Sequence, residues 1–130
     1  MSVMSVIRTS QARRSQTPAA TMTTLASPTL GTADRPIWRV DVVAGAPSGP
    51  RHVIDVEQIW VFTDGGATVE LAGESYAVAA GDTIVVPADA ERSVAADPAS
   101  GFSAIVTAPA GGRAWTLPRE GDGIVPPWTV

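Results

Sequence analysis

The alternation of apolar and polar residues is the strongest pattern in the chain. Over residues 37–43, Trp38 and Val40 fall on one face of an extended segment, while Arg39 and Asp41 fall on the other. Side chains of a strand point alternately to its two faces, so this spacing is typical of a strand with one buried face. The pattern predicts a β-strand over residues 37–43.

Further extended segments follow, separated by turns rich in glycine, proline and aspartate. Asp64-Gly65-Gly66 predicts a tight hairpin turn, and Gly73-Glu74 predicts a second one. No segment keeps a helical period over a dozen positions. About eight to ten short strands are typical of an antiparallel sandwich or barrel. The predicted strands span residues 20–30 (an edge strand), 52–63, 68–71, 76–79, 83–86, 92–95 and 102–107.

The length of 130 residues suits one domain. Residues 1–17 are polar and without periodicity, which predicts a flexible arm with a short strand at residues 6–7, and residues 18–130 form the single domain. In the proline-rich tail, Trp115 and Trp128 are predicted to pack against the barrel or a second subunit. Met22 is expected to cover the barrel mouth.

Composition removes several kinds of chemistry. The chain has no cysteine and no lysine, and His52 is its single histidine, so disulfides, thiolate metal sites, Schiff bases and multi-histidine sites are excluded. Residues 34–130 hold thirteen acids and six arginines, a net charge of −7, which argues against a nucleic-acid partner. No apolar run predicts a secretory signal or a membrane span. We therefore expect a cytoplasmic protein without a membrane partner.

Two segments resemble the paired motifs of the cupin family of small jelly-roll β-barrels. The first runs from Gly45 through His52 to Gly65, and the second is Gly81-Asp82, four residues, a proline, and Arg92 five positions later. The resemblance covers about residues 36–108. It implies an all-β, cupin-type jelly-roll β-barrel with an N-terminal arm and a proline-rich C-terminal tail.

The family's metal ligands are two histidines, a glutamate and a third histidine. Aligned with that motif, this chain places His52, Ile54, Gln58 and Arg92 at those positions. Isoleucine cannot coordinate a metal, an amide is a weak ligand, and a guanidinium repels a cation. A second register, with His52 and Glu57 as ligands, still supplies only two. We expect no metal and no cofactor, which disfavours a metal-dependent oxygenase.

Alternate residues from position 52 to position 62 share one face of an extended strand. Because the family's ligands point into the barrel, the resemblance assigns this face to the interior. An apolar cavity with a few polar groups is typical of a small-molecule site. The candidate residues are His52 and Arg92 for catalysis, and Ile54, Gln58, Trp60 and Phe62 for substrate contact.

Structural roles stay open for each candidate. His52 could lie at the rim, and Gln58 could satisfy a buried backbone group. Arg92 could reach solvent beside neighbouring acids. The two aromatic residues could simply belong to the core.

The sequence leads to two functional hypotheses. In the first, a metal-independent cyclase or isomerase acts on a small organic anion, with His52 as general acid or base and Arg92 stabilising oxyanion charge. Gln58 would orient the substrate, and Trp60 and Phe62 would stack on it. In the second, a non-catalytic domain binds or senses a ligand in the same cavity. The family resemblance also implies a homodimer.

Overall fold

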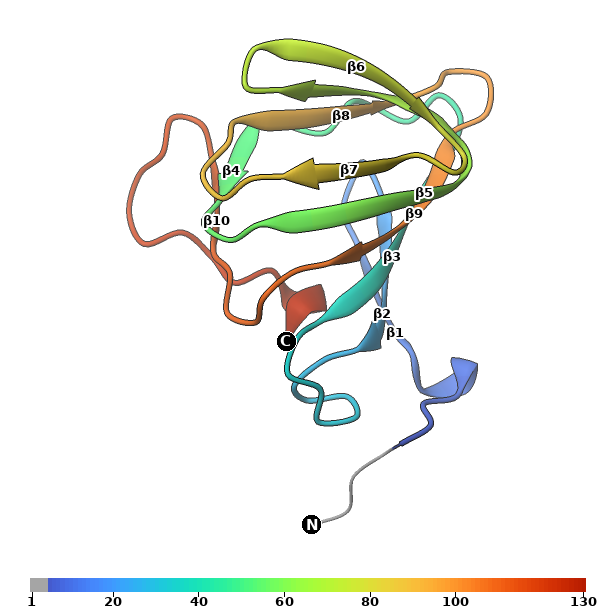
Figure 1. Cartoon of the computed structure of the whole chain (residues 1–130), viewed down its shortest axis with the longest axis vertical. Helices are drawn as coiled ribbons and strands as arrows, with labels where there is room; N and C mark the ends of the chain where they lie inside the picture. The colour runs from blue at the N-terminus through green and yellow to red at the C-terminus, as the bar shows by residue number, and fades with distance from the viewer. Residues whose placement is uncertain (1–4) are drawn as a thin grey trace.

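The regular secondary structure of the chain is almost entirely β-strand, as a computed structural model of residues 5–130 describes it (Figure 1). The two short 3-10 helices, η1 (Thr9–Gln11) and η2 (Pro127–Thr129), lie near the ends. No helix within residues 5–130 is long and apolar enough to cross a membrane. In this part of the chain the strands are β1 (Arg13–Gln16), β2 (Thr21–Ala26), β3 (Ile37–Val42), β4 (His52–Ile54), β5 (Gln58–Leu71), β6 (Glu74–Ala79), β7 (Thr83–Val86), β8 (Arg92–Ala96), β9 (Phe102–Thr107) and β10 (Ala114–Thr116).

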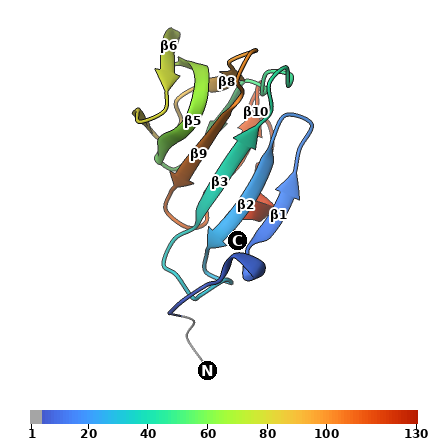
Figure 2. The same ribbon diagram turned by 90° about the vertical axis from the view of Figure 1, so that its right-hand side faces the viewer.

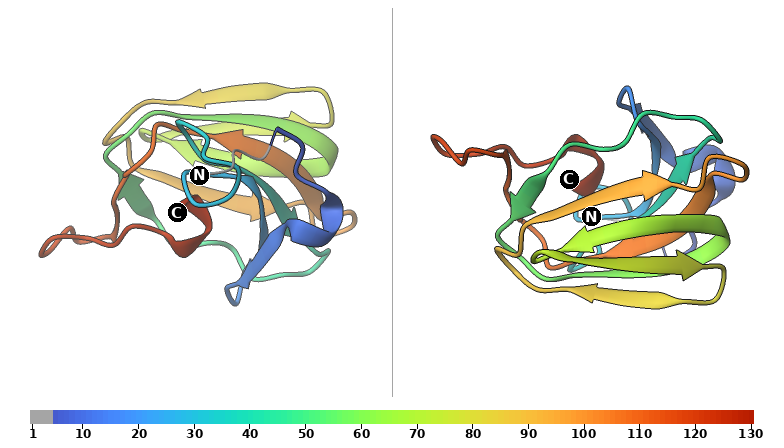
Figure 3. Two further views of the ribbon diagram at one scale, coloured as in Figure 1. Left: turned by 90° about the horizontal axis from the view of Figure 1, so that it is seen from below. Right: turned by 90° about the horizontal axis from the view of Figure 1, so that it is seen from above.

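Strand β5 links the two halves of the barrel. Its first half pairs with β7 and β9, and its second half, residues 66–71, pairs with β6 and β8. The remaining strands extend this arrangement in the order β1-β2-β3-β9-β5-β8-β4-β10. Figure 2 shows β1, β2, β3, β9 and β5 side by side, and Figure 3 shows the sheet curling around the C-terminal segment. The architecture is the cupin-type jelly roll that the sequence predicted.

The prediction of a hairpin at Asp64-Gly65-Gly66 is wrong, because β5 continues through these residues without reversing its direction. The chain passes from one half of the barrel to the other here, with a register shift between Phe62 and Asp64. Gly65 has φ +68°, and a Cβ on it would lie 2.1 Å from the carbonyl oxygen of Gly101. The glycines therefore mark a bend and a close backbone approach instead of a chain reversal.

Most other predicted strands are confirmed. Strands β7 and β9 have the predicted bounds, and β3 ends one residue early. The hairpin between β5 and β6 turns at Ala72 and Gly73, both with positive φ, as a two-residue hairpin turn requires. The long strand predicted over residues 52–63 is instead two strands, β4 and β5, with a bend at 55–57.

The core forms where inward-facing residues of β3, β5 and β9 meet. Trp38 and Val40 are buried, as the alternation predicted, and Ala104 and Val106 on β9 have no exposed surface. The cluster comprises Trp38, Val40, Phe62, Ala67, Val69, Phe102, Ala104, Val106 and Ala108.

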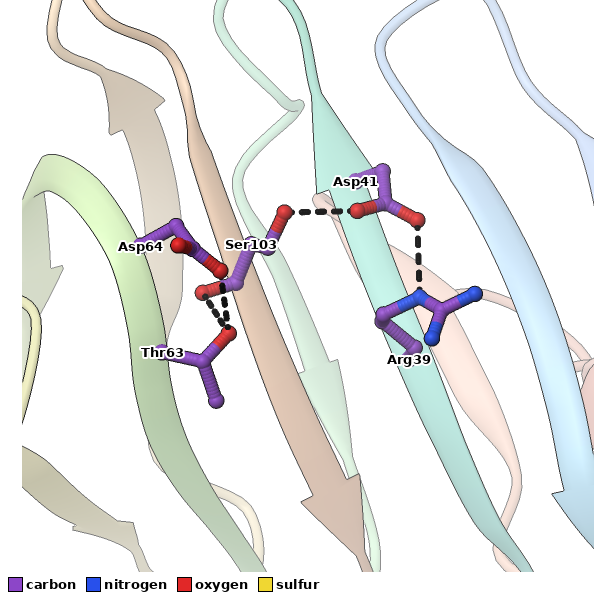
Figure 4. Close-up of polar contacts among 5 residues, drawn as sticks. All are labelled: Arg39, Asp41, Thr63, Asp64 and Ser103. Carbon is purple, nitrogen blue, oxygen red and sulfur yellow. Dashed lines mark hydrogen bonds and ion pairs between the residues drawn. The ribbon is translucent and has the colours of Figure 1, made fainter.

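The outer face of the same strands is polar near the point where β5 bends (Figure 4). Asp41 accepts hydrogen bonds from Ser103 Oγ at 2.6 Å and from Arg39 Nε at 3.2 Å. Thr63 Oγ1 donates across to the carbonyl oxygen of Ser103 at 3.2 Å. These contacts join the exposed faces of β3, β9 and β5, on the side of the sheet opposite the core.

The N-terminal region differs in detail from the prediction. Within the segment expected to be an arm, β1 pairs antiparallel with β2 and forms the edge of the sheet. The edge strand predicted over residues 20–30 is therefore an inner strand, β2, between β1 and β3. Residues 6 and 7 form no strand. Backbone pairing, which does not need an apolar pattern, orders residues 13–16.

The tail returns to the barrel and is held by hydrogen bonds to β2 and the residues after it. Thr24, which is 1% exposed, donates from Oγ1 to the carbonyl oxygen of Trp128 at 2.7 Å. The carbonyl oxygen of Val130 accepts from Ser27 Oγ at 2.8 Å and from Thr29 Oγ1 at 2.9 Å. Strand β10 pairs with β4. The tail therefore forms part of the wall around the barrel interior.

Candidate functional site

A cavity of about 970 Å³ occupies the barrel interior. This volume is at the upper end of the range of roughly 300–1,000 Å³ usual for ligand pockets. Its lining is mainly apolar and comes from β2 and residues 17–20 before it, from β3, β4, β5, β7, β8 and β9, from the 47–50 loop, and from the tail including β10. All four tryptophans of the chain are among the lining residues: Trp38, Trp60, Trp115 and Trp128.

His52 begins β4 and lies in the cavity wall. Its Nδ1 is 2.8 Å from the carbonyl oxygen of Pro50. Because a carbonyl only accepts, Nδ1 carries the proton and the neutral ring presents Nε2 as an acceptor. Burial lowers the pKa of His52 below its usual 6.5 and Arg92 lowers it further, against the raising effect of the Pro50 hydrogen bond. His52 is thus a neutral base at physiological pH.

Arg92 is directly opposite His52, because the two residues pair across β4 and β8. It is only 4% exposed. Its Nε donates to the carbonyl oxygen of Ala90 at 3.2 Å and its Nη1 to Gln58 Oε1 at 3.0 Å. Nη2 is buried and has no hydrogen-bond partner among residues 5–130. Burial lowers the pKa of Arg92 to about 10, so it remains a cation at neutral pH.

No carboxylate in residues 5–130 forms an ion pair with Arg92. The arginines that do form ion pairs are Arg35, Arg39, Arg51 and Arg119. The carboxylates on the cavity wall, Glu120 and Asp122, are exposed residues of the tail. A buried cation without a counter-ion is costly, and an anionic ligand would offset that cost.

Gln58 opens β5 and is 5% exposed. Its Oε1 accepts from Arg92 Nη1 and, at 3.1 Å, from Trp60 Nε1. Both partners are donors only, so the amide oxygen must face them and the amide nitrogen faces away. Gln58 therefore adds N–H donors to the cavity wall beside the guanidinium.

The aromatic candidates divide between the cavity and the core. Trp60 lines the cavity, and its ring stacks on Phe62 with centroids 6.0 Å apart. Phe62 is 1% exposed and is not among the lining residues, so it lies behind Trp60. Phe102 reaches the cavity and contacts Phe62 at 5.4 Å between centroids. Ile54 also lines the cavity.

Sequence reasoning missed much of the apolar wall. The cavity lining includes residues that were not site candidates. Among them are Met22, Phe102 of β9, and Trp115 and Trp128 of the tail. Trp115 is held by a hydrogen bond from Nε1 to the carbonyl oxygen of Gly121 at 3.0 Å and by Arg119 3.7 Å above its ring. The sequence signal that could have identified the tail as part of the cavity wall is the presence of two tryptophans in this short segment.

The residues at the family's metal positions do not fit a metal ion. His52 is joined there by Gln58 and Arg92, and the guanidinium is itself the cation of the site. The alternative ligand, Glu57, is an exposed residue of the bend before β5. No group of three or more histidine, cysteine, aspartate or glutamate residues within residues 5–130 is arranged to hold a metal.

Structural comparison gives several relatives of similar shape. The polyketide cyclase RemF from Streptomyces resistomycificus is 20% identical with a TM-score of 0.75, over 92% of this chain and 89% of that one. The DMSP lyase DddQ from Ruegeria pomeroyi is 17% identical with a TM-score of 0.73, over 87% and 64%. Salicylate 1,2-dioxygenase from Pseudoaminobacter salicylatoxidans, in complex with gentisate, is 18% identical with a TM-score of 0.68, over 78% and 30%. At these identities the likeness establishes the fold alone.

No curated protein sequence matches the chain. The family model of the cupin domain, however, matches residues 38–106, which is more than half of the chain. These residues include most of β3, all of β4 to β8 and most of β9, and with them His52, Gln58 and Arg92. On the sequence match and the shared jelly roll together, the chain belongs to the cupin domain family.

Proposed function

We propose that this cupin binds a small organic anion with a largely apolar, aromatic-sized body and acts on it as a metal-independent enzyme of the cyclase or isomerase type. The observation that carries the proposal is the guanidinium of Arg92, which is buried on the cavity wall without a counter-ion and with Nη2 unpaired. The tryptophan-lined interior supports an apolar body for the ligand.

The proposed chemistry is a proton transfer next to a carbonyl group. Nε2 of His52 takes a proton from the carbon beside the carbonyl, the C–H electron pair forms a carbon–carbon double bond, and the carbonyl oxygen becomes the oxyanion. Arg92 and the Gln58 amide stabilise that oxygen. In an isomerase, the enolate is extended by a conjugated carbon–carbon double bond, and His52 returns the proton to its far carbon, so that the double bond shifts. In a cyclase, the enolate carbon attacks a second carbonyl of the same molecule, whose oxygen then takes the proton. Trp60 and Ile54 contact the body of the substrate, and Phe62 supports Trp60 from behind.

Binding is tested with naphthylacetate and its neutral analogue naphthylacetamide by isothermal titration calorimetry. We expect the wild-type protein to prefer the carboxylate by about tenfold or more, since charge-assisted hydrogen bonds exceed neutral ones. Arg92→Met should lose the preference. Arg51→Met is the matched control, because Arg51 is exposed and outside the cavity lining. Equal affinity of the wild-type protein for the two compounds would refute the proposal.

A non-catalytic ligand-binding or sensing domain is the alternative, supported by the same cavity. The two are separated by deuterium exchange from D₂O into naphthoylpropionate, an acid with exchangeable hydrogens next to its ketone, followed by mass spectrometry. An enzyme should accelerate the exchange, and His52→Gln should abolish the acceleration. Binding of this acid with the same exchange rate in both proteins would favour the non-catalytic alternative.

The homodimer and the cytoplasmic location remain proposals. Light scattering during size-exclusion chromatography gives the mass in solution directly. A dimer should have twice the 13.4 kDa mass of the chain, whereas a mass that stays at that of one chain up to high concentration would contradict the dimer.

A further inference from the structure

We propose that the cavity recognises a hydroxy acid, a ligand whose carboxylate carries a hydroxyl on the adjacent carbon. In the bound complex, Arg92 and Gln58 would bind the carboxylate oxygens and Nε2 of His52 would accept the hydrogen bond of the hydroxyl. Nε2 would exchange that hydrogen bond for the proton of the carbon that carries the hydroxyl only in the later proton-transfer step. This inference rests on the proposed function and deepens it, because it specifies the head group of the ligand.

The donor half of the site is fixed by contacts within the protein. Trp60 Nε1 and Arg92 Nη1 both donate to Gln58 Oε1, at 3.1 and 3.0 Å. A flipped amide would place its N–H groups against two donors, which no hydrogen bond allows. Trp60 is thus a positioning residue that holds the Gln58 donors toward the cavity. With the uncompensated guanidinium, this half of the site favours negatively charged oxygen.

The acceptor half of the site is fixed in the same way. The carbonyl oxygen of Pro50 holds the proton of His52 on Nδ1, which leaves the lone pair of Nε2 as the acceptor. No hydrogen bond to Nε2 forms within residues 5–130. A simple carboxylate has no proton to offer this nitrogen, whereas a hydroxyl group has one.

The two halves are neighbours. His52 and Arg92 pair across adjacent strands, and the Cβ atoms of such pairs are about 4.5–5.5 Å apart. In addition to burial, the charge of Arg92 acts on the ring of His52, whose pKa it lowers. A ligand oxygen bound by Arg92 and Gln58 therefore lies close to a group bound by His52. A hydroxyl on the carbon next to the carboxylate meets this spacing, and a ligand that lacks it leaves His52 without its partner.

The remaining wall defines the rest of the ligand. The tryptophans and Phe102 offer ring surfaces, and the acids of the lining, Glu120 and Asp122, are exposed in the tail. A cationic amino group beside the carboxylate would be repelled by Arg92, so amino acids are disfavoured. The favoured ligand is a hydroxy acid with an apolar body of aromatic size.

The test compares three ligands by isothermal titration calorimetry at neutral pH. They are naphthylacetate, naphthylglycolate (the same acid with a hydroxyl on the carbon next to the carboxylate, each enantiomer separately) and the methyl ether of naphthylglycolate. Wild-type protein should bind one enantiomer of the hydroxy acid about five- to tenfold more tightly than naphthylacetate, as one net hydrogen bond allows. The methyl ether, which cannot donate, should lose this gain.

The same ligands are then titrated into His52→Phe, which keeps a ring but has no acceptor. In this variant the affinity for naphthylacetate is the new baseline, and the hydroxyl of naphthylglycolate should add nothing to it. The inference is overturned if the hydroxyl gives no gain in the wild-type protein, or if the gain survives in His52→Phe. Failure of the proposed function has a different signature, equal binding of naphthylacetate and its amide by the wild-type protein.

Discussion

At the scale of single residues, the candidate site depends on the hydrogen bonds of His52, Gln58 and Arg92. It depends equally on the polar atoms that these bonds leave without a partner. Gln58 accepts from Arg92 and Trp60, and His52 donates to Pro50. Within the described part of the chain, Nη2 of Arg92, a donor, and Nε2 of His52, an acceptor, have no hydrogen-bond partner. A cation and a base in close proximity are the minimum for moving a proton beside an oxyanion.

The first residue-scale prediction concerns the pH dependence of His52. Burial lowers its pKa below 6.5, so on acidification the unfolded chain takes up the proton before the folded protein does. The stability that neutral His52 contributes is therefore complete above pH 6.5 and is lost as the pH falls through the folded-state pKa. NMR titration should give a midpoint below 6.5, and the signal is unambiguous because the chain has one histidine.

Chemical denaturation provides the matching control. Between about pH 7 and pH 5 the free energy of unfolding of the wild-type protein should fall more than that of His52→Gln. A midpoint at or above 6.5, or identical pH profiles of the two proteins, would contradict a buried neutral imidazole.

The second residue-scale prediction is that Arg92 is retained for binding and not for stability. Replacing a buried, unpaired cation by an apolar side chain of similar length removes a desolvation cost, as replacements of buried charges often do. Arg92→Met should leave the free energy of unfolding unchanged or raise it by about 1 kcal/mol. Urea unfolding measures the change. A loss of more than about 2 kcal/mol would mean that the Gln58 and Ala90 contacts are structural.

At the scale of elements, β5 is the strand on which the site depends. Its first residue, Gln58, belongs to the polar cluster formed by His52, Gln58 and Arg92. Its third residue, Trp60, belongs to the cavity wall. The strand then bends at Gly65 and continues into the second half of the barrel, where β8 pairs with it and supplies Arg92. One continuous strand thus fixes the position of the donors relative to the cation.

The third prediction tests this bend. Gly65→Ala places a Cβ 2.1 Å from the carbonyl oxygen of Gly101 at a φ of +68°, so both the backbone conformation and a clash oppose it. We expect a loss of more than about 3 kcal/mol in the free energy of unfolding. Gly73→Ala is the control, because its φ is +84° but nothing lies within 4 Å of the added atom. It should cost only the left-handed backbone penalty, about 1–2 kcal/mol. Equal losses in the two variants would show that the approach to Gly101 is not rigid.

At the scale of the whole molecule, the cavity is closed by segments from both ends of the described chain. The cupin match ends at residue 106, yet Trp115, Trp128 and Met22 complete the apolar wall from outside it. The matched region supplies the polar cluster and the flanking segments supply much of the ring surface. For the proposed ligand, the contacts to the apolar body would therefore come largely from outside the motifs that identify the family.

The fourth prediction tests how the tail is held. Thr24→Val keeps the shape of a buried residue and removes its hydrogen bond to Trp128, and it should cost about 1 kcal/mol of stability. Affinity for naphthylacetate should fall with it, because Trp128 is part of the wall. Hydrogen exchange of the tail amides should quicken in the same variant.

The neighbouring Thr23→Val is the control for this prediction, since Thr23 is 4% exposed but makes no hydrogen bond to the tail. If Thr24→Val exchanges its tail amides no faster than Thr23→Val does, the tail is held by packing and not by this hydrogen bond.

The sequence by itself determined the fold class, most strand positions and the character of the site. Period-two alternation and turn residues are local properties, so β3 could be predicted from its alternation and β7 and β9 from the turns that bound them. The motif spacing placed a histidine, a glutamine and an arginine where the family holds a metal, and in the structure these three residues lie together at one end of the cavity. Their chemistry follows from residue type alone.

The tertiary structure decided the rest, because the deciding contacts join residues far apart in the chain. The residue types of Asp64-Gly65-Gly66 predict a hairpin turn. In the structure these residues form a bend within β5, where the backbone of Gly101 approaches Gly65 closely. Likewise, Phe62 lies in the core and not on the cavity wall because Trp60 and Phe102 cover it, and the tail tryptophans reach the cavity because β2 and the residues after it hold the tail. The unpaired state of Arg92 is of the same kind, since a missing partner can be recognised only when every neighbour is in place.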